Sequence, residues 1–124
     1  MAERYWNVDE ANEALERVAA MVEQARQAVA SMQERNASAR EGAAGNGHAK
    51  KGTGEQDLQA VLDELAADGI VLRDIEQGLI DFPARAPSGR EYWLCWLVGE
   101  PDVSWWHWPE DGFAGRTPLS QPPT

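Results

Sequence analysis

Apolar residues at helical spacing run through the first part of this chain. From Val8 to Met32 the intervals alternate between three and four positions, which is the a/d rhythm of a heptad repeat over about four repeats. This spacing predicts one long helix with all of these residues on one side: Val8, Ala11, Leu15, Val18, Val22, Ala25, Val29 and Met32. Asn7 and Glu10 have the types and spacing of a capping box, so we expect helix one to span residues 7–35.

The composition changes after this helix. Residues 36–54 contain five glycines and no large apolar residue, so burial there cannot offset the entropy of ordering, and we predict a flexible linker. A shorter helical pattern follows over residues 55–69, where Gly69 is placed to end the helix in the left-handed conformation. The two helices are expected to form an antiparallel hairpin.

The two predicted helices differ in length. At 1.5 Å per residue, helix one spans about 42 Å and helix two about 20 Å, so helix two cannot cover the far end of the apolar stripe. An uncovered apolar seam is typical of an interface. We therefore predict a homodimer, or a larger oligomer, through four residues of helix one: Val22, Ala25, Val29 and Met32. The alternative is that this end of the helix folds back over the sheet.

After Gly69 the pattern changes to short β-rich runs bounded by turn residues. These runs predict a four-stranded antiparallel β-meander over residues 70–116, followed by an irregular tail over 117–124. The chain has the length of a single domain, residues 1–124. We expect an α+β fold in which the helical hairpin covers one face of the sheet. The predicted strands lie within residues 70–75, 79–82, 91–98 and 104–108.

The net charge of the chain disfavours two classes of binding partner. Eleven Lys and Arg residues against 21 Asp and Glu residues give a formal net charge of −10, which repels nucleic-acid phosphates and anionic lipid headgroups. The longest apolar run, residues 92–98, is too short to cross a bilayer. The single cysteine cannot form an internal disulfide, and the first residues lack a secretory apolar region. We expect a soluble cytoplasmic protein with no cofactor.

Residues 94–108 concentrate the rarest side chains of the chain. They hold four of its six tryptophans, its only cysteine and one of its two histidines. Tryptophan at this density can form a dry core, a protein interface or a ligand-stacking surface. We favour binding of a protein or a small molecule, and predict its contacts from six residues: Trp96, Glu100, Trp105, Trp106, His107 and Arg116.

The strand register decides whether Cys95 and His107 can act together. A two- or four-residue loop within the GEPD segment, residues 99–102, pairs Cys95 with an even-numbered residue, which places Cys95 and His107 on opposite faces. A one-residue bulge at Gly99 would change the parity and bring them to one face. Without a bulge, we expect Cys95 to be a small buried hydrophobe and His107 to be a hydrogen-bonded histidine, with no metal site.

Several strings together resemble the motifs of a widespread family of small prokaryotic proteins catalogued as a domain of unknown function. These strings are YWNVDEANEAL, DIEQGLIDFPA, YWLCWLVGEPDVSWWHW and DGFAGRTPL. The resemblance covers nearly the whole chain except the glycine-rich linker, and it implies a helical hairpin followed by a β-meander without an assigned activity. The motif positions that it implies are Asp81, Pro83, Cys95, Trp96, Gly99, Glu100, Trp106, His107, Gly112, Phe113 and Arg116.

These observations favour a non-catalytic interaction or ligand-binding module that self-associates. The competing hypothesis is a small enzyme, either Cys/His nucleophilic or a metal-assisted hydrolase, with its site on the tryptophan-rich hairpin. Its candidate catalytic residues are Cys95, His107, Glu100 and Asp81. A shared face for Cys95 and His107, beside an open cleft, would favour the enzyme. An adaptor that binds through its glycine-rich linker is a third alternative.

Overall fold

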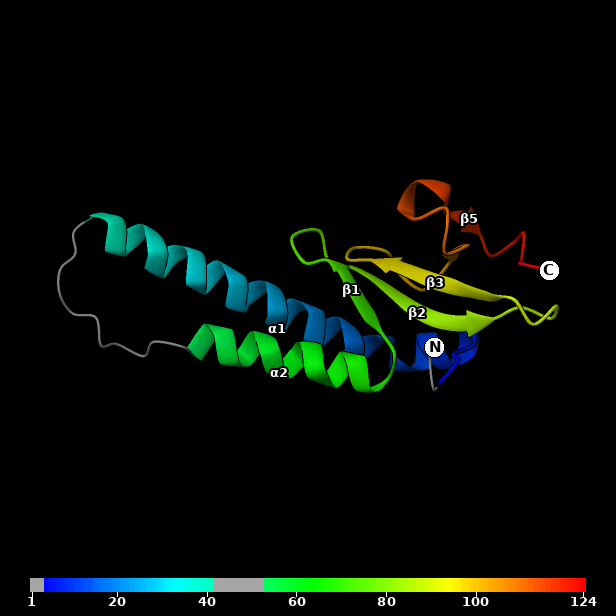
Figure 1. The fold of residues 1–124 in the computed structure, drawn as a ribbon, viewed down its shortest axis with the longest axis horizontal. Helices are drawn as coiled ribbons and strands as arrows, with labels where there is room; N and C mark the ends of the chain where they lie inside the picture. The colour runs from blue at the N-terminus through cyan, green and yellow to red at the C-terminus, as the bar shows by residue number, and fades with distance from the viewer. Residues whose placement is uncertain (1–3, 42–52) are drawn as a thin grey trace.

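The computed structural model describes residues 4–41 and 53–124. In these ranges two helices precede one antiparallel sheet, whose five strands follow chain order. The helices lie against one face of the sheet, and part of the helical hairpin extends beyond it (Figure 1). The predicted α+β class is confirmed. The elements are α1 (Val8–Glu41), α2 (Thr53–Ala67), β1 (Val71–Asp74), β2 (Leu79–Arg85), β3 (Glu91–Leu97), β4 (Trp105–His107), η1 (Phe113–Gly115) and β5 (Thr117–Pro118).

The start of α1 and the end of α2 carry the capping residues that the sequence indicated. The side chain of Asn7 accepts a hydrogen bond from the N–H of Glu10 at 2.8 Å, and the Glu10 carboxylate accepts one from the N–H of Asn7 at 3.3 Å. This pair is the reciprocal capping box at the start of α1. After α2, Gly69 adopts φ 77° while the N–H of Ile70 donates to the carbonyl of Leu65 at 3.0 Å. That arrangement is a Schellman motif.

Several element boundaries differ from the prediction. α1 continues to Glu41 and α2 begins at Thr53, so both ends of the predicted linker are helical. The rest of that linker, residues 42–52, lies outside the described residues. The tail is not irregular throughout, because Thr117 and Pro118 form β5 and pair with β4. This pairing gives β4 a second neighbour and closes an edge that would otherwise be open.

The core lies between the helices and the inner face of the sheet. Ile80, Phe82 and Leu94 are fully buried there with apolar residues of α1 and α2. Trp6 packs edge-on against Phe82, with ring centroids 5.2 Å apart, and its indole N–H donates to the Asp68 carbonyl at 3.0 Å. The N-terminal segment is therefore fastened both to β2 and to the end of α2.

The apolar stripe of α1 is better covered than its length suggested. Val22 and Ala25 are fully buried within the chain, because α2 and the β1–β2 turn pack against this part of the helix. Val29 and Met32 are only half-buried. The expectation that nothing in the chain covers these four residues is therefore wrong for Val22 and Ala25. Self-association itself stays a prediction. In the described ranges, no helix combines the length and the apolar character needed to cross a bilayer.

Candidate functional site

Gly99 sets the register of the β3–β4 hairpin. The N–H of Glu100 donates to the carbonyl of Leu97 at 3.0 Å, and Gly99 adopts φ 104°, as a turn with a left-handed third residue requires. The connection consequently holds an odd number of residues, and Cys95 pairs with Trp105. The predicted register was wrong. The observed pairing is the one expected when the hairpin has one extra residue at Gly99. Cys95 and His107 therefore share a face of the sheet.

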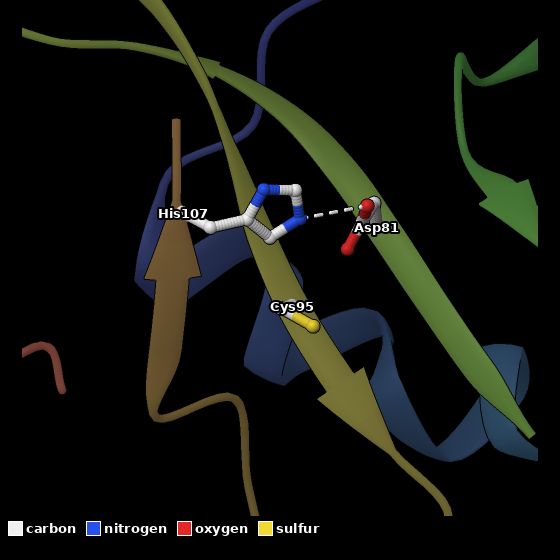
Figure 2. Close-up of side chains that lie close together, drawn as sticks. All are labelled: Asp81, Cys95 and His107. Atoms are coloured by element: carbon white, nitrogen blue, oxygen red, sulfur yellow. Dashed lines mark hydrogen bonds and ion pairs between the residues drawn. The ribbon is translucent and has the colours of Figure 1, made fainter. Parts of the chain in front are cut away.

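Three neighbouring strands bring Asp81, Cys95 and His107 together on the outer face of the sheet, which is the face turned away from α1 (Figure 2). Asp81 on β2 is the register partner of Cys95 on β3. The His107 side chain reaches from β4 across β3, and its Nε2 lies 3.0 Å from Oδ2 of Asp81. One ligand atom from each residue lies within 4.8 Å of the other two. All three residues are buried, with 3% or less exposed.

The outer face is covered by tryptophans and arginines of the same chain. Trp93 is the register partner of His107, and Trp105 is that of Cys95; both indoles are half-buried. The guanidinium of Arg73 lies 4.8 Å from the Trp93 ring centroid, and that of Arg116 lies 4.9 Å from the Trp105 ring centroid. In such cation–π stacks the arginine side chain covers the apolar face of the indole ring, while the guanidinium charge stays near water. These arginine side chains therefore shield part of the outer face of the sheet from solvent.

Asp81 connects most of the polar groups of this cluster. Its Oδ2 accepts a hydrogen bond from Nε of Arg73 at 2.9 Å, in addition to its contact with His107. Its Oδ1 is buried and has no hydrogen-bond partner among the described residues. A buried polar atom without a partner destabilises a fold by about 1–3 kcal/mol and is uncommon. The carboxylate therefore retains unused capacity to accept a hydrogen bond or to bind a cation.

His107 is held between two acceptors. Its Nδ1 lies 2.8 Å from the Trp108 carbonyl, and its Nε2 faces the Asp81 carboxylate. Only the doubly protonated ring donates to both. Burial lowers the pKa of His107, but the hydrogen bonds to Asp81 and to the Trp108 carbonyl outweigh it, so the pKa is raised above its usual value. These hydrogen bonds favour the imidazolium form of His107, which pairs with the buried Asp81 carboxylate.

Cys95 is a protonated thiol in this arrangement. Burial, followed by the charge of Asp81, raises the pKa of Cys95 to about 12, and the neighbouring Arg116 acts in the opposite direction. A thiol is nucleophilic only as the thiolate, which this environment disfavours. His107 Nε2 is directed at Asp81 rather than at Cys95. The cluster therefore lacks the geometry in which a histidine deprotonates a neighbouring cysteine.

Glu100 has a different position from the other candidate catalytic residues. Its carboxylate accepts hydrogen bonds from the N–H of Leu97 at 2.9 Å and from Nη2 of Arg116 at 2.8 Å. These contacts fix the Arg116 guanidinium, whose charge opposes the rise in the pKa of Cys95. Nε of Arg116 is a second buried polar atom with no partner in the part of the chain that the structure describes.

The six predicted contact residues separate into two groups. Trp96, Trp106 and His107 are buried, with 5%, 5% and 3% exposed, so none of them presents a binding surface to a partner protein. Trp105, Glu100 and Arg116 lie partly exposed on the outer face. The prediction missed Arg73, which orients Asp81. A charged residue within the apolar run of β1 was the available signal.

The comparisons with known proteins concern almost the whole of this fold. A family model described as "Uncharacterized conserved protein (DUF2203)" matches residues 4–119. The matched range contains both helices, all five strands and the Asp81–Cys95–His107 cluster. The resemblance to a domain of unknown function is confirmed. A search of curated proteins and one of solved structures each gave no match.

Proposed function

We propose that this chain, which belongs to the DUF2203 family of uncharacterized conserved proteins, is a non-catalytic binding module that self-associates through its helical hairpin. The observation that carries the proposal is the part of the hairpin that extends beyond the sheet (Figure 1). Val29 and Met32 remain half-exposed on the α1 segment far from the capping box. Apolar side chains on such a projecting helix are typical of helix–helix interfaces.

A groove supports a second copy of the chain as the occupant of this surface. It has a volume of about 320 Å³ and lies where the β1–β2 turn meets α1, and its apolar lining comes from Val29, Ala30 and Ile75. Arg26 stands at the same place and donates to the Glu76 carbonyl at 3.1 Å. Two hairpins packed about a two-fold axis would place the apolar residues of each copy against the groove of the other, as in a four-helix bundle.

The chemistry of the buried cluster supports a non-catalytic role. Cys95 is inaccessible and its thiol is protonated at neutral pH, while His107 is already engaged by Asp81. The Cys/His form of the competing enzyme hypothesis needs an exposed nucleophile beside a free base, and its metal-assisted form needs a ligand position open to substrate. Neither condition is met by the contacts of these residues, so binding is the better-supported function.

Light scattering coupled to size-exclusion chromatography tests the self-association. We expect the full chain to be a dimer at micromolar concentration, and Val29→Glu to be a folded monomer because a buried carboxylate opposes the interface. The matched control is Gln24→Glu, which adds the same charge at an exposed position of α1 and should stay dimeric. A wild-type chain that is monomeric at tens of micromolar would contradict the proposal.

A further inference from the structure

We infer that Asp81, Cys95 and His107 form a binding site for one divalent transition-metal ion, and that zinc suits its ligand atoms best. This inference goes beyond the proposed self-association and uses none of its residues. A carboxylate oxygen, a sulfur and an imidazole nitrogen are all zinc ligands. Calcium and magnesium instead prefer sites made only of oxygen atoms.

The spacing of the three side chains fits one small ion. Their ligand atoms lie within 4.8 Å of one another, and ligands of a tetrahedral zinc are about 3.3–3.6 Å apart, given metal–ligand distances near 2.0 Å for nitrogen or oxygen and 2.3 Å for sulfur. Small side-chain rotations therefore close the site. Because the three residues come from paired strands of one sheet, their backbones are already fixed in position.

The hydrogen bonds around the cluster match those that orient metal ligands. Arg73 holds Oδ2 of Asp81 at 2.9 Å, while Oδ1 is buried and has no partner within the described ranges. Oδ1 is therefore available to the ion without loss of the Arg73 contact. His107 directs Nδ1 at the Trp108 carbonyl. A histidine that ligates a metal through one nitrogen commonly donates its other N–H to a carbonyl in this way.

The second unpartnered atom lies on the Cys95 side of the cluster. Nε of Arg116 is buried and has no acceptor in the described segments, and the guanidinium is close enough to Cys95 to act on its thiol. A metal-bound thiolate is a good acceptor for such a donor. Metal binding would therefore give Oδ1 of Asp81 a partner and would create a thiolate that the nearby Arg116 charge favours.

Proton release keeps the charge of the cluster constant. When Asp81 and His107 are paired as carboxylate and imidazolium and the Cys95 thiol is protonated, the metal-free cluster is neutral. When zinc binds, the S–H proton and the Nε2–H proton leave to solvent, and bonds form from Sγ, Nε2 and Oδ1 to the ion. The carboxylate and thiolate then balance the two positive charges of zinc. The flanking Arg73 and Arg116 consequently experience no added net charge.

A purely structural ion pair explains less of what is observed. It accounts for Oδ2 of Asp81 and for the ring of His107. It does not account for the vacant Oδ1 of Asp81 or for a cysteine sulfur within 4.8 Å of the Asp81 and His107 ligand atoms. The metal site accounts for all of these together.

Cobalt absorption tests the inference on the unmodified chain. Reduced, chelator-treated protein titrated with Co²⁺ should bind one ion per chain and develop both a near-ultraviolet thiolate-to-cobalt charge-transfer band and visible bands of tetrahedral cobalt. Since the chain has one cysteine, the charge-transfer band reports Cys95 alone. Zinc should displace the cobalt and abolish both signals. Saturating Co²⁺ without the charge-transfer band would overturn the inference even if every variant failed to fold.

Zinc competition against a chromophoric chelator then identifies the ligands. Cys95→Ala and Asp81→Asn should each weaken zinc binding by more than about 100-fold, which exceeds the effect of changing an outer-shell residue, and Arg73→Met should weaken it about tenfold. The control is His48→Ala, which removes the other histidine of the chain and should leave the affinity unchanged. Folding of each variant is checked by circular dichroism. A folded Cys95→Ala chain with wild-type zinc affinity would overturn the inference.

Discussion

The two faces of the sheet are built from alternate residues of the same strands, yet they are buried for different reasons. Phe82 and Leu94 point inward and lose only apolar surface, which stabilises the fold. Their neighbours Asp81 and Cys95 point outward and are equally buried, although a buried carboxylate opposes folding unless it is paired. Burial alone therefore does not distinguish core from site. The distinction lies in whether the buried atoms are satisfied by the fold itself.

The first prediction concerns access to the outer face. At pH 8, Cys95 in the native protein should react with iodoacetamide at least about 10³-fold more slowly than in the denaturant-unfolded chain, because its pKa is about 12 instead of 9.0 and it is fully buried. Mass spectrometry of timed aliquots measures both rates. If Cys95 in the native protein reacted as fast as in the unfolded chain, the outer face would not be closed to reagents.

A large-to-small substitution on the inner face should have the largest effect on stability. Phe82→Ala should lower the free energy of unfolding by about 3–5 kcal/mol, because it leaves a cavity in a close-packed core. Cys95→Ala, on the adjacent strand but on the outer face, should cost only about 1 kcal/mol, because it removes a single heavy atom. Urea unfolding followed by tryptophan fluorescence measures both values. Equal losses would contradict the distinction between the faces.

Replacing the buried polar residues of the outer face by leucine tests whether their ion pair stabilises the fold. His107→Leu alone should destabilise the metal-free protein by about 3 kcal/mol, because it leaves the Asp81 carboxylate buried with only Arg73 as partner. Asp81→Leu combined with His107→Leu should recover most of that loss and abolish zinc binding. Chemical unfolding with and without zinc measures both effects. A double variant no more stable than the single one would show that the ion pair itself stabilises the fold.

A modest loss of stability is expected at the turn that sets the register. Gly99→Ala should cost about 1–2 kcal/mol, because φ 104° is unfavourable for a residue with a Cβ although no atom stands in its way. Thermal unfolding measures the loss, and cross-strand proton contacts between Cys95 and Trp105 report the register. A stability equal to that of the wild type would argue against a left-handed requirement at Gly99.

The sequence was sufficient for both helices and the first four strands, but not for β5 or for the register of the sheet. Heptad spacing, the Asn7 capping box and Gly69 act within a few residues, so the start of α1 and the end of α2 could be predicted from local pattern. The register of β3 and β4 depends on one backbone dihedral at Gly99, which no pattern of side chains encodes. A parity error of one residue moved the predicted Cys95 and His107 to opposite faces.

Contacts between residues far apart in the chain could not be predicted from the sequence either. Val22 is covered by a turn that lies far along the chain at Gly78, and Asp81 is oriented by Arg73 from the neighbouring strand. Tryptophan density correctly marked residues 94–108 as unusual, but it did not separate the core indole of Trp106 from the arginine-stacked indole of Trp105. That separation follows only from the register.

Native mass spectrometry of the full chain, purified without chelator and supplied with equimolar zinc, tests the central claim about the outer face most directly. The account predicts one zinc ion per chain, lost in Cys95→Ala and retained in His48→Ala. The same spectrum reports whether the chain is a dimer. A wild-type chain that carries no zinc, or a Cys95→Ala chain that retains it, would contradict the assignment of Asp81, Cys95 and His107 as a metal site.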